Sequence, residues 1–108
     1  MLSKTNIHTA FQKISNYWDP RVIGELNGQQ VKLARFHGAF HAHRHETEDE
    51  MFLVIKGSFQ MELPDQIMHL EEGDMVIIPR GTLHKPVAID EAQVLLFEPG
   101  TTRKKGDE

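Results

Sequence analysis

Residues 38–57 read GAFHAHRHETEDEMFLVIKG, and this stretch decides how the chain is interpreted. It carries His41, His43 and His45 at alternate positions. Side chains alternate between the two faces of a strand, so an extended segment would project these three from one face. Imidazole is the commonest metal-binding side chain, and a His-x-His pair on a strand is a natural start for a chelate. The alternative is a polar strand face without a ligand.

The acidic run that follows the histidines ends in a residue with a different environment. Glu46–Asp49 have the composition of a solvated loop, whereas Glu50 is fused to the apolar run Met51–Ile55. A carboxylate at the mouth of a buried strand needs a partner, and a cation is a good one. Glu50 therefore joins the histidines as a candidate metal ligand.

Outward from this stretch, the chain predicts an all-β domain. Short apolar segments are separated by Gly- and Pro-containing turns about every ten residues, which is typical of a sandwich or barrel. Asn27–Gly28 is a hairpin signal, and Thr9–Asn16 has the spacing of a short helix or strap. The expected strands are Val22–Leu26, Val31–Phe36, Met51–Ile55, Ser58–Leu63, Ile67–Leu70, Met75–Ile78 and Val94–Phe97.

Length and composition fit one soluble domain over residues 1–108, with a barrel core at about 20–99 and a flexible tail at 101–108. The net charge of −4 argues against a nucleic-acid partner, and the absence of cysteine excludes thiolate and iron–sulfur chemistry. No apolar run is long enough for a membrane span, so we expect no membrane partner. The N-terminus has no secretory signal pattern, so we expect a cytoplasmic location.

Three of the expected strands have apolar residues at both odd and even positions: Met51–Ile55, Met75–Ile78 and Val94–Phe97. A half-solvated strand would alternate, so both faces of this part of the sheet should be covered. A small barrel has one interior, and the outer face needs a second cover. We therefore expect a homodimer. The alternative is that the N-terminal segment covers the outer face alone.

A second stretch, GDMVIIPRGTLHKPVA at residues 73–88, makes a family resemblance specific. His43, His45, Glu50 and Gly57 resemble the first cupin motif, and Gly73, Pro79, Gly81 and His84 resemble the second. The resemblance implies a single small jelly-roll cupin barrel (a double-stranded β-helix) with a short N-terminal helix or strap. It also implies that His43, His45, Glu50 and His84 bind a metal.

Three imidazoles and one carboxylate suit one divalent transition metal per chain: Fe, Mn, Ni, Cu, Co or Zn. The set is too rich in nitrogen for calcium or magnesium. Four ligands of an octahedral ion leave two positions for water, dioxygen or a bidentate substrate. The alternative is a cupin scaffold without metal, because fold does not fix function.

Other residues are candidates for the pocket. His41 is a possible proton-transfer group, unless it is a strand histidine bonded to the backbone or a bulge reverses its face. Arg35 and Arg80 would bind a carboxylate or phosphate if they pointed into the barrel mouth; otherwise they are surface residues. The expected inward-facing apolar residues are Phe36, Phe40, Phe52, Val54, Phe59, Met61, Ile77, Leu95 and Phe97.

The sequence is compatible with two functions. The first is a metalloenzyme acting on a small organic molecule, of dioxygenase or isomerase/decarboxylase type. The second is a non-catalytic module that binds a small metabolite or the metal itself. Because 108 residues leave no room beside a barrel for the DNA-binding domain that a sensor usually carries, we favour the enzyme.

Overall fold

The computed structural model describes residues 2–107 and contains one short helix and seven strands. The elements are α1 (Ile7–Gln12), β1 (Arg21–Leu26), β2 (Gln29–Ala39), β3 (Glu50–Lys56), β4 (Ser58–Leu63), β5 (Gln66–Glu71), β6 (Met75–Ile78) and β7 (Lys85–Pro99). All pairings between these strands are antiparallel. The all-β fold with a short N-terminal helix is therefore confirmed. Within the described residues, no helix is long and apolar enough to cross a bilayer.

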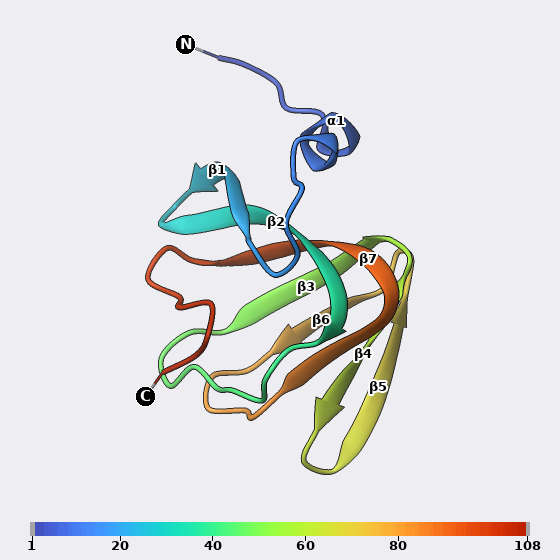
Figure 1. Ribbon diagram of the computed structural model, residues 1–108. Coiled ribbons are helices and arrows are strands. Elements are labelled where there is room, and N and C mark those ends of the chain that lie inside the picture. The colour runs from blue at the N-terminus through green and yellow to red at the C-terminus, as the bar shows by residue number, and fades with distance from the viewer. Residues whose placement is uncertain (1, 108) are drawn as a thin grey trace.

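Strand β7 organises the barrel. Its 15 residues pair with β2, β3 and β4, so the order β1-β2-β7-β3-β6 is joined on β7 by the β4–β5 hairpin. Figure 1 shows β7 curving around the barrel from its start beside β4 to its end beside β2 and β3. The sequence predicted only Val94–Phe97 of this strand, because the exposed polar residues Asp90 and Glu91 interrupt its apolar pattern.

The barrel interior is a single apolar cluster. Phe36, Phe52 and Phe59 make edge-to-face or tilted ring contacts at centroid distances of 5.1 to 6.4 Å. The predicted inward positions of Phe36, Phe52, Val54, Phe59 and Met61 are confirmed, since all are buried there.

Three predicted inward positions are wrong. Ile77 is exposed, and Leu95 and Phe97 are half-buried on the outer face. Side chains alternate between the two faces of a strand, and the inward-facing residues of these strands are Ile78, Val94 and Leu96. Their neighbours Ile77, Leu95 and Phe97 therefore face outward.

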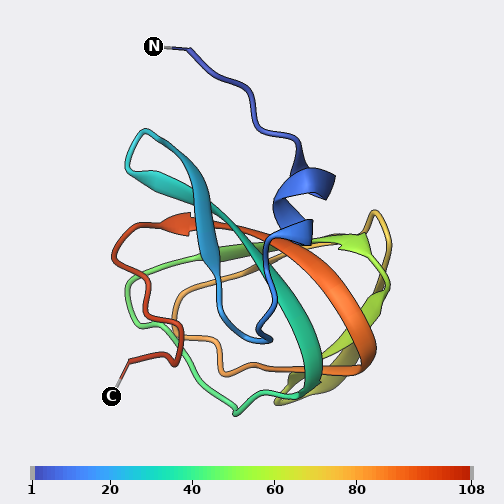
Figure 2. The same ribbon diagram turned by 45° about the horizontal axis from the view of Figure 1, so that its top comes forward.

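The N-terminal segment covers part of the outer face of the sheet. Phe11 and Ile14 form a second cluster with Leu33, and the half-buried Ile55 and Leu95 pack against it. The Arg35 guanidinium holds this segment in place by donating to the carbonyl oxygens of Phe11 and Ile14. Figure 2 shows α1 lying above β7 at one end of the barrel.

Helix α1 begins at Ile7 rather than at the predicted Thr9. Its N-cap is Asn6, whose side-chain oxygen accepts a hydrogen bond from the Thr9 N–H. The helix ends at Gln12, and the remaining predicted residues up to Asn16 lie outside it.

The C-terminal segment, residues 101–107, packs against the loop between β2 and β3. The Asp107 N–H donates to the Arg44 carbonyl oxygen at 2.9 Å, and the Asp107 carboxylate accepts from the Glu46 N–H at 2.8 Å. Thr102 is buried. The segment is thus in contact with the barrel, and the flexibility expected from its composition stays a prediction.

The tight turn at Gly57 yields a stability prediction. Gly57 has a φ of +83°, and a Cβ there would lie 2.6 Å from the Glu91 carbonyl oxygen. Gly73 has a φ of +89°, but a Cβ there would meet no atom within 4 Å. Left-handed backbone costs an L-residue about 1–2 kcal/mol. In urea unfolding of the metal-free protein, Gly73→Ala should lower the free energy of unfolding by about that amount. Gly57→Ala should lower it clearly more. Equal losses would show that the backbone around Glu91 yields freely.

Candidate metal centre

Four potential metal ligands from three segments converge at one end of the barrel. His43 and His45 lie in the loop after β2, Glu50 is the first residue of β3, and His84 immediately precedes β7. One potential ligand atom from each lies within 4.8 Å of the others. The structure thus brings together the four residues that the sequence predicted as metal ligands.

Backbone pairing sets this convergence. The His43 N–H donates to the His84 carbonyl oxygen at 3.0 Å, and the His84 N–H donates back at 2.9 Å. Residues paired in this way carry their side chains on the same side. The Gly81 N–H donates to the His45 carbonyl oxygen at 2.7 Å and holds the second loop against the first.

The atoms that face the centre of the cluster are buried without hydrogen bonds. Glu50 Oε1 lies 3.0 Å from His45 Nε2 and 3.1 Å from His84 Nε2. All three atoms are inaccessible, and none has a hydrogen-bond partner among the described residues. Unsatisfied buried polar atoms cost free energy, and a shared cation would satisfy all three together. The donor set therefore fits a metal ion.

The outer nitrogens of two histidines fix the tautomer that a metal requires. His84 Nδ1 lies 2.9 Å from the Thr82 carbonyl oxygen, and His43 Nδ1 lies 3.0 Å from the His41 carbonyl oxygen. A carbonyl oxygen only accepts, so each Nδ1 carries the hydrogen. Each Nε2 then keeps a free lone pair for an ion.

Two further carboxylates accompany His45. Potential ligand atoms of His45, Glu48 and Asp107 lie within 4.8 Å of one another. Because His45 Nε2 faces Glu50, the buried Nδ1 is the nitrogen left for these carboxylates. Thr101 Oγ1 donates to Glu48 Oε2 at 2.8 Å and fixes that side chain. A carboxylate behind a ligating histidine orients the ring and raises its basicity.

Burial and mutual charge set the electrostatics of the cluster. Burial lowers the pKa of His43 to about 4. Burial also opposes the charged form of His45 and Glu50, but their contact outweighs it. The pKa of His45 is therefore raised, and the pKa of Glu50, which also contacts His84, is lowered. In the metal-free protein the cluster stabilises a negative charge on Glu50.

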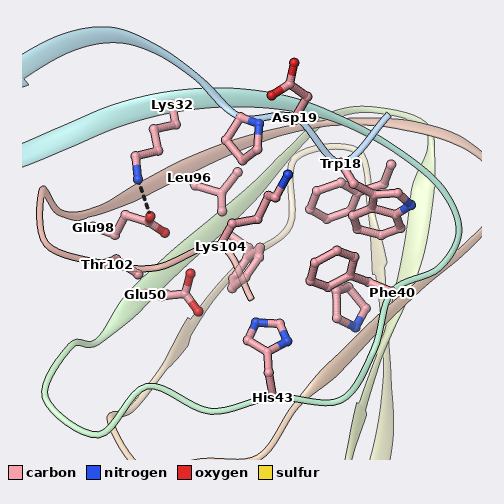
Figure 3. A pocket seen from close by; sticks show the side chains of 14 residues that line it. Trp18, Asp19, Lys32, Phe40, His43, Glu50, Leu96, Glu98, Thr102 and Lys104 are labelled. Carbon is pink, nitrogen blue, oxygen red and sulfur yellow. Dashed lines mark hydrogen bonds and ion pairs between the residues drawn. The ribbon is translucent and has the colours of Figure 1, made fainter. Parts of the chain in front are cut away.

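A pocket of about 290 Å³ opens onto His43 and Glu50. Its aromatic wall comprises Trp18, Phe36, Phe40 and Phe52, in which Trp18 stacks on Phe36 and Phe40 at centroid distances of 4.4 and 4.9 Å. Figure 3 shows His43 and Glu50 on one side of the pocket and Trp18 on the other. The charged side chains that line it are Asp19, Lys32, Glu50, Glu98 and Lys104.

A buried ion pair forms part of the pocket wall. Lys32 Nζ lies 2.7 Å from Glu98 Oε2, and both side chains are nearly inaccessible. Burial and the neighbouring Glu50 raise the pKa of Glu98 to about 8, against the opposing effect of Lys32. Glu98 therefore holds its proton to a higher pH than an ordinary carboxyl group, because burial and Glu50 together outweigh Lys32.

The other candidate polar residues lie outside the pocket. His41 is exposed and its Nε2 donates to the Lys105 carbonyl oxygen at 3.1 Å. Its ring lies beside that of His43, at a centroid distance of 5.3 Å, but it does not line the pocket. Strand β2 ends at Ala39, so no regular strand carries the three histidines. A proton-transfer role for His41 stays a prediction. Arg80 pairs with Asp49, and Arg35 pairs with Glu91.

The sequence reasoning missed Trp18, Lys32 and Glu98 as pocket residues. A signal was present for two of them. Lys32 shares parity with the inward Ala34 and Phe36, and Glu98 shares parity with the inward Val94 and Leu96. Trp18 had no such signal, because it lies in a loop with a φ of +56°.

Comparison with known proteins agrees with this geometry. A family model described as "Cupin domain" matches residues 29–100. The chain is 36% identical over 64 residues to the uncharacterized protein YdbB of Bacillus subtilis (strain 168). That match covers 58% of this chain and 57% of YdbB, so it spans little more than half of the relative.

Solved structures give the same result over more of the chain. A cupin-2 domain containing protein from Shewanella frigidimarina has a TM-score of 0.86 and 39% identity, covering 88% of this chain and 93% of that one. KdgF from Halomonas sp. has a TM-score of 0.64 and 26% identity, covering 74% and 78%. With two thirds of its residues matched by the family model and the predicted ligands gathered inside the barrel, the chain belongs to the cupin domain family.

Proposed function

We propose that this protein is a metal-dependent enzyme acting on a small organic molecule at His43, His45, Glu50 and His84. The observation that carries the proposal is the convergence of His45 Nε2, His84 Nε2 and Glu50 Oε1 next to a pocket, where all three are buried without hydrogen bonds. Oriented ligands beside a space for a second molecule are what catalysis at a metal requires.

The donor set favours one divalent transition metal per chain. Three imidazoles suit iron, manganese, nickel, copper, cobalt or zinc, whereas calcium and magnesium prefer oxygen donors. When bound, such an ion would act as a Lewis acid or in redox chemistry, which supports dioxygenase or isomerase/decarboxylase chemistry. The protein would orient the substrate through the aromatic wall and exclude water from the pocket.

The assembly that we propose is a homodimer in the cytoplasm. On the outer face, Met75 and Ile77 of β6 are 54% and 56% exposed, and Met51 and Leu53 of β3 pair beside them. The N-terminal cluster covers Leu33 and Leu95 but leaves this part of the sheet open. Burial of this apolar surface by a second copy would be favourable.

Metal content tests the enzyme proposal. Untagged wild-type protein from metal-replete cells should contain about one transition-metal ion per chain by elemental analysis. His84→Ala should lose most of it, because one of three imidazoles is removed. His69→Ala is the matched control, since His69 is exposed and outside the cluster, and it should keep its metal. A metal-free wild type would overturn the proposal.

Turnover separates an enzyme from a binding module. Iron, copper and manganese forms should be followed for oxygen uptake with diketones, thiols and catechols. Consumption that His84→Ala abolishes supports a dioxygenase. If no metal form consumes oxygen with any of these compounds, the dioxygenase reaction is excluded. Isomerase or decarboxylase activity is then assayed by product analysis.

Metal-linked stability should be lost in acid. The folded protein keeps His43 neutral down to about pH 4, whereas the unfolded chain protonates it below about pH 6.5. The stability that neutral His43 contributes is therefore present above pH 6.5 and falls as pH drops toward 4.

Protonation of the ligands also competes with the metal. A hundredfold excess of zinc over its Kd should raise the melting temperature by on the order of 10 °C at pH 7.5. At pH 5 most of this rise should vanish; an equal rise would contradict histidine ligation.

Light scattering tests the dimer. Wild-type protein at micromolar concentration should have about twice the chain mass of 12.4 kDa. Ile77→Asp should shift the mass to that of one chain, because it buries a carboxylate at the interface. Ile89→Asp is the control, since Ile89 is 79% exposed on β7, and it should leave the dimer intact. A wild-type mass of one chain would refute the dimer.

A further inference from the structure

The pocket carries one ammonium group without a carboxylate partner among residues 2–107. Lys104 lines the pocket, and none of the ion pairs of the described residues includes it. Figure 3 shows its side chain on the side of Trp18 and Asp19, away from His43. The candidate metal ligands therefore lie on one side of the pocket, and Lys104 lies on the other, where Asp19 is paired with Arg21.

The other charged groups of the pocket are already compensated. Lys32 pairs with Glu98 at 2.7 Å, and Asp19 pairs with Arg21 at 2.9 Å. Glu50 lies among the imidazoles, and a divalent ion bound there would keep a positive charge after Glu50 offsets part of it. The loaded pocket thus has an excess of positive charge, which attracts an anion.

The segment that carries Lys104 is anchored on both sides. Thr102 is buried before it, and Gly106 packs so closely that a Cβ there would lie 2.7 Å from the Cβ of His43. The Asp107 N–H bonds to the Arg44 carbonyl oxygen. The backbone that carries the exposed Lys104 is therefore held at the pocket, and less backbone entropy is lost when Lys104 binds a ligand.

The wall between the two sides is aromatic and apolar. Trp18, Phe40 and Phe52 line it together with Leu96. A wall of this kind accommodates a flat or apolar body, with a few polar groups fixing its orientation. The volume of about 290 Å³ limits that body to a small metabolite.

We propose that the pocket binds small organic monoanions, and that Lys104 of the C-terminal segment selects them by pairing with their carboxylate. The apolar body of the ligand packs on the wall beside Trp18, and its other end faces the metal ligands. This inference names the substrate class of the proposed metalloenzyme and so rests on that function, but its own test does not require turnover.

Trp18 provides the readout, because it is the only tryptophan of the chain and it lines the pocket. Its fluorescence is titrated with acetate, phenylacetate and benzoate, and with the neutral amide of each, in zinc-loaded and chelator-treated protein. We expect saturable changes with benzoate and phenylacetate, and weaker binding of the amides. Lys104→Gln should weaken carboxylate binding by about three- to tenfold and leave amide binding unchanged.

Lys105→Gln is the matched control, since Lys105 is exposed like Lys104 but does not line the pocket. It should bind the carboxylates as the wild type does. Equal weakening by both variants, or no saturable binding of any carboxylate, would overturn the proposal. If the wild-type protein from metal-replete cells contains no metal but its carboxylate binding still depends on Lys104, the metalloenzyme is refuted and this inference is kept. If the protein contains metal but its carboxylate binding does not depend on Lys104, this inference is refuted and the metalloenzyme is kept.

Discussion

Burial of the Glu50 carboxylate is the constraint on which the site depends. A charge taken out of water costs several kcal/mol unless partners replace the lost solvation. Here those partners are His45 and His84, at 3.0 and 3.1 Å. They reach Glu50 only if two loops without regular structure are held together, which the backbone pairing of His43 with His84 achieves. Folding of the loops and assembly of the site are thus one event, and an ion that binds there stabilises the fold.

The four candidate ligands were predictable from the sequence because the two motifs that resemble the cupin family are local to two short stretches. His43, His45 and Glu50 lie within eight residues, and His84 lies in the second stretch with Pro79 and Gly81. Most strands were predictable for a similar reason, since apolar runs end at Gly and Pro turns. The curvature of β7 was not, because it depends on pairing with three other strands rather than on its own residues.

The direction in which strand residues face was harder to predict. In β3, β6 and β7 both parities are apolar, so hydrophobicity alone could not tell Leu95 from Leu96. The charged residues held the missing information. Lys32 and Glu98 are 66 positions apart, and each is a polar residue among inward-facing apolar residues that contacts the other at 2.7 Å. Long-range compensation of this kind can be recognised only once the strand register is known.

The C-terminal segment makes contacts that its polar composition does not predict. Its contacts use backbone groups, such as the Asp107 N–H and the Lys105 carbonyl oxygen, which composition does not report. Close packing of Gly106 on His43 then ties this segment to a metal ligand. A ligand held by Lys104 and an ion held by His43 would act on the same short stretch of chain.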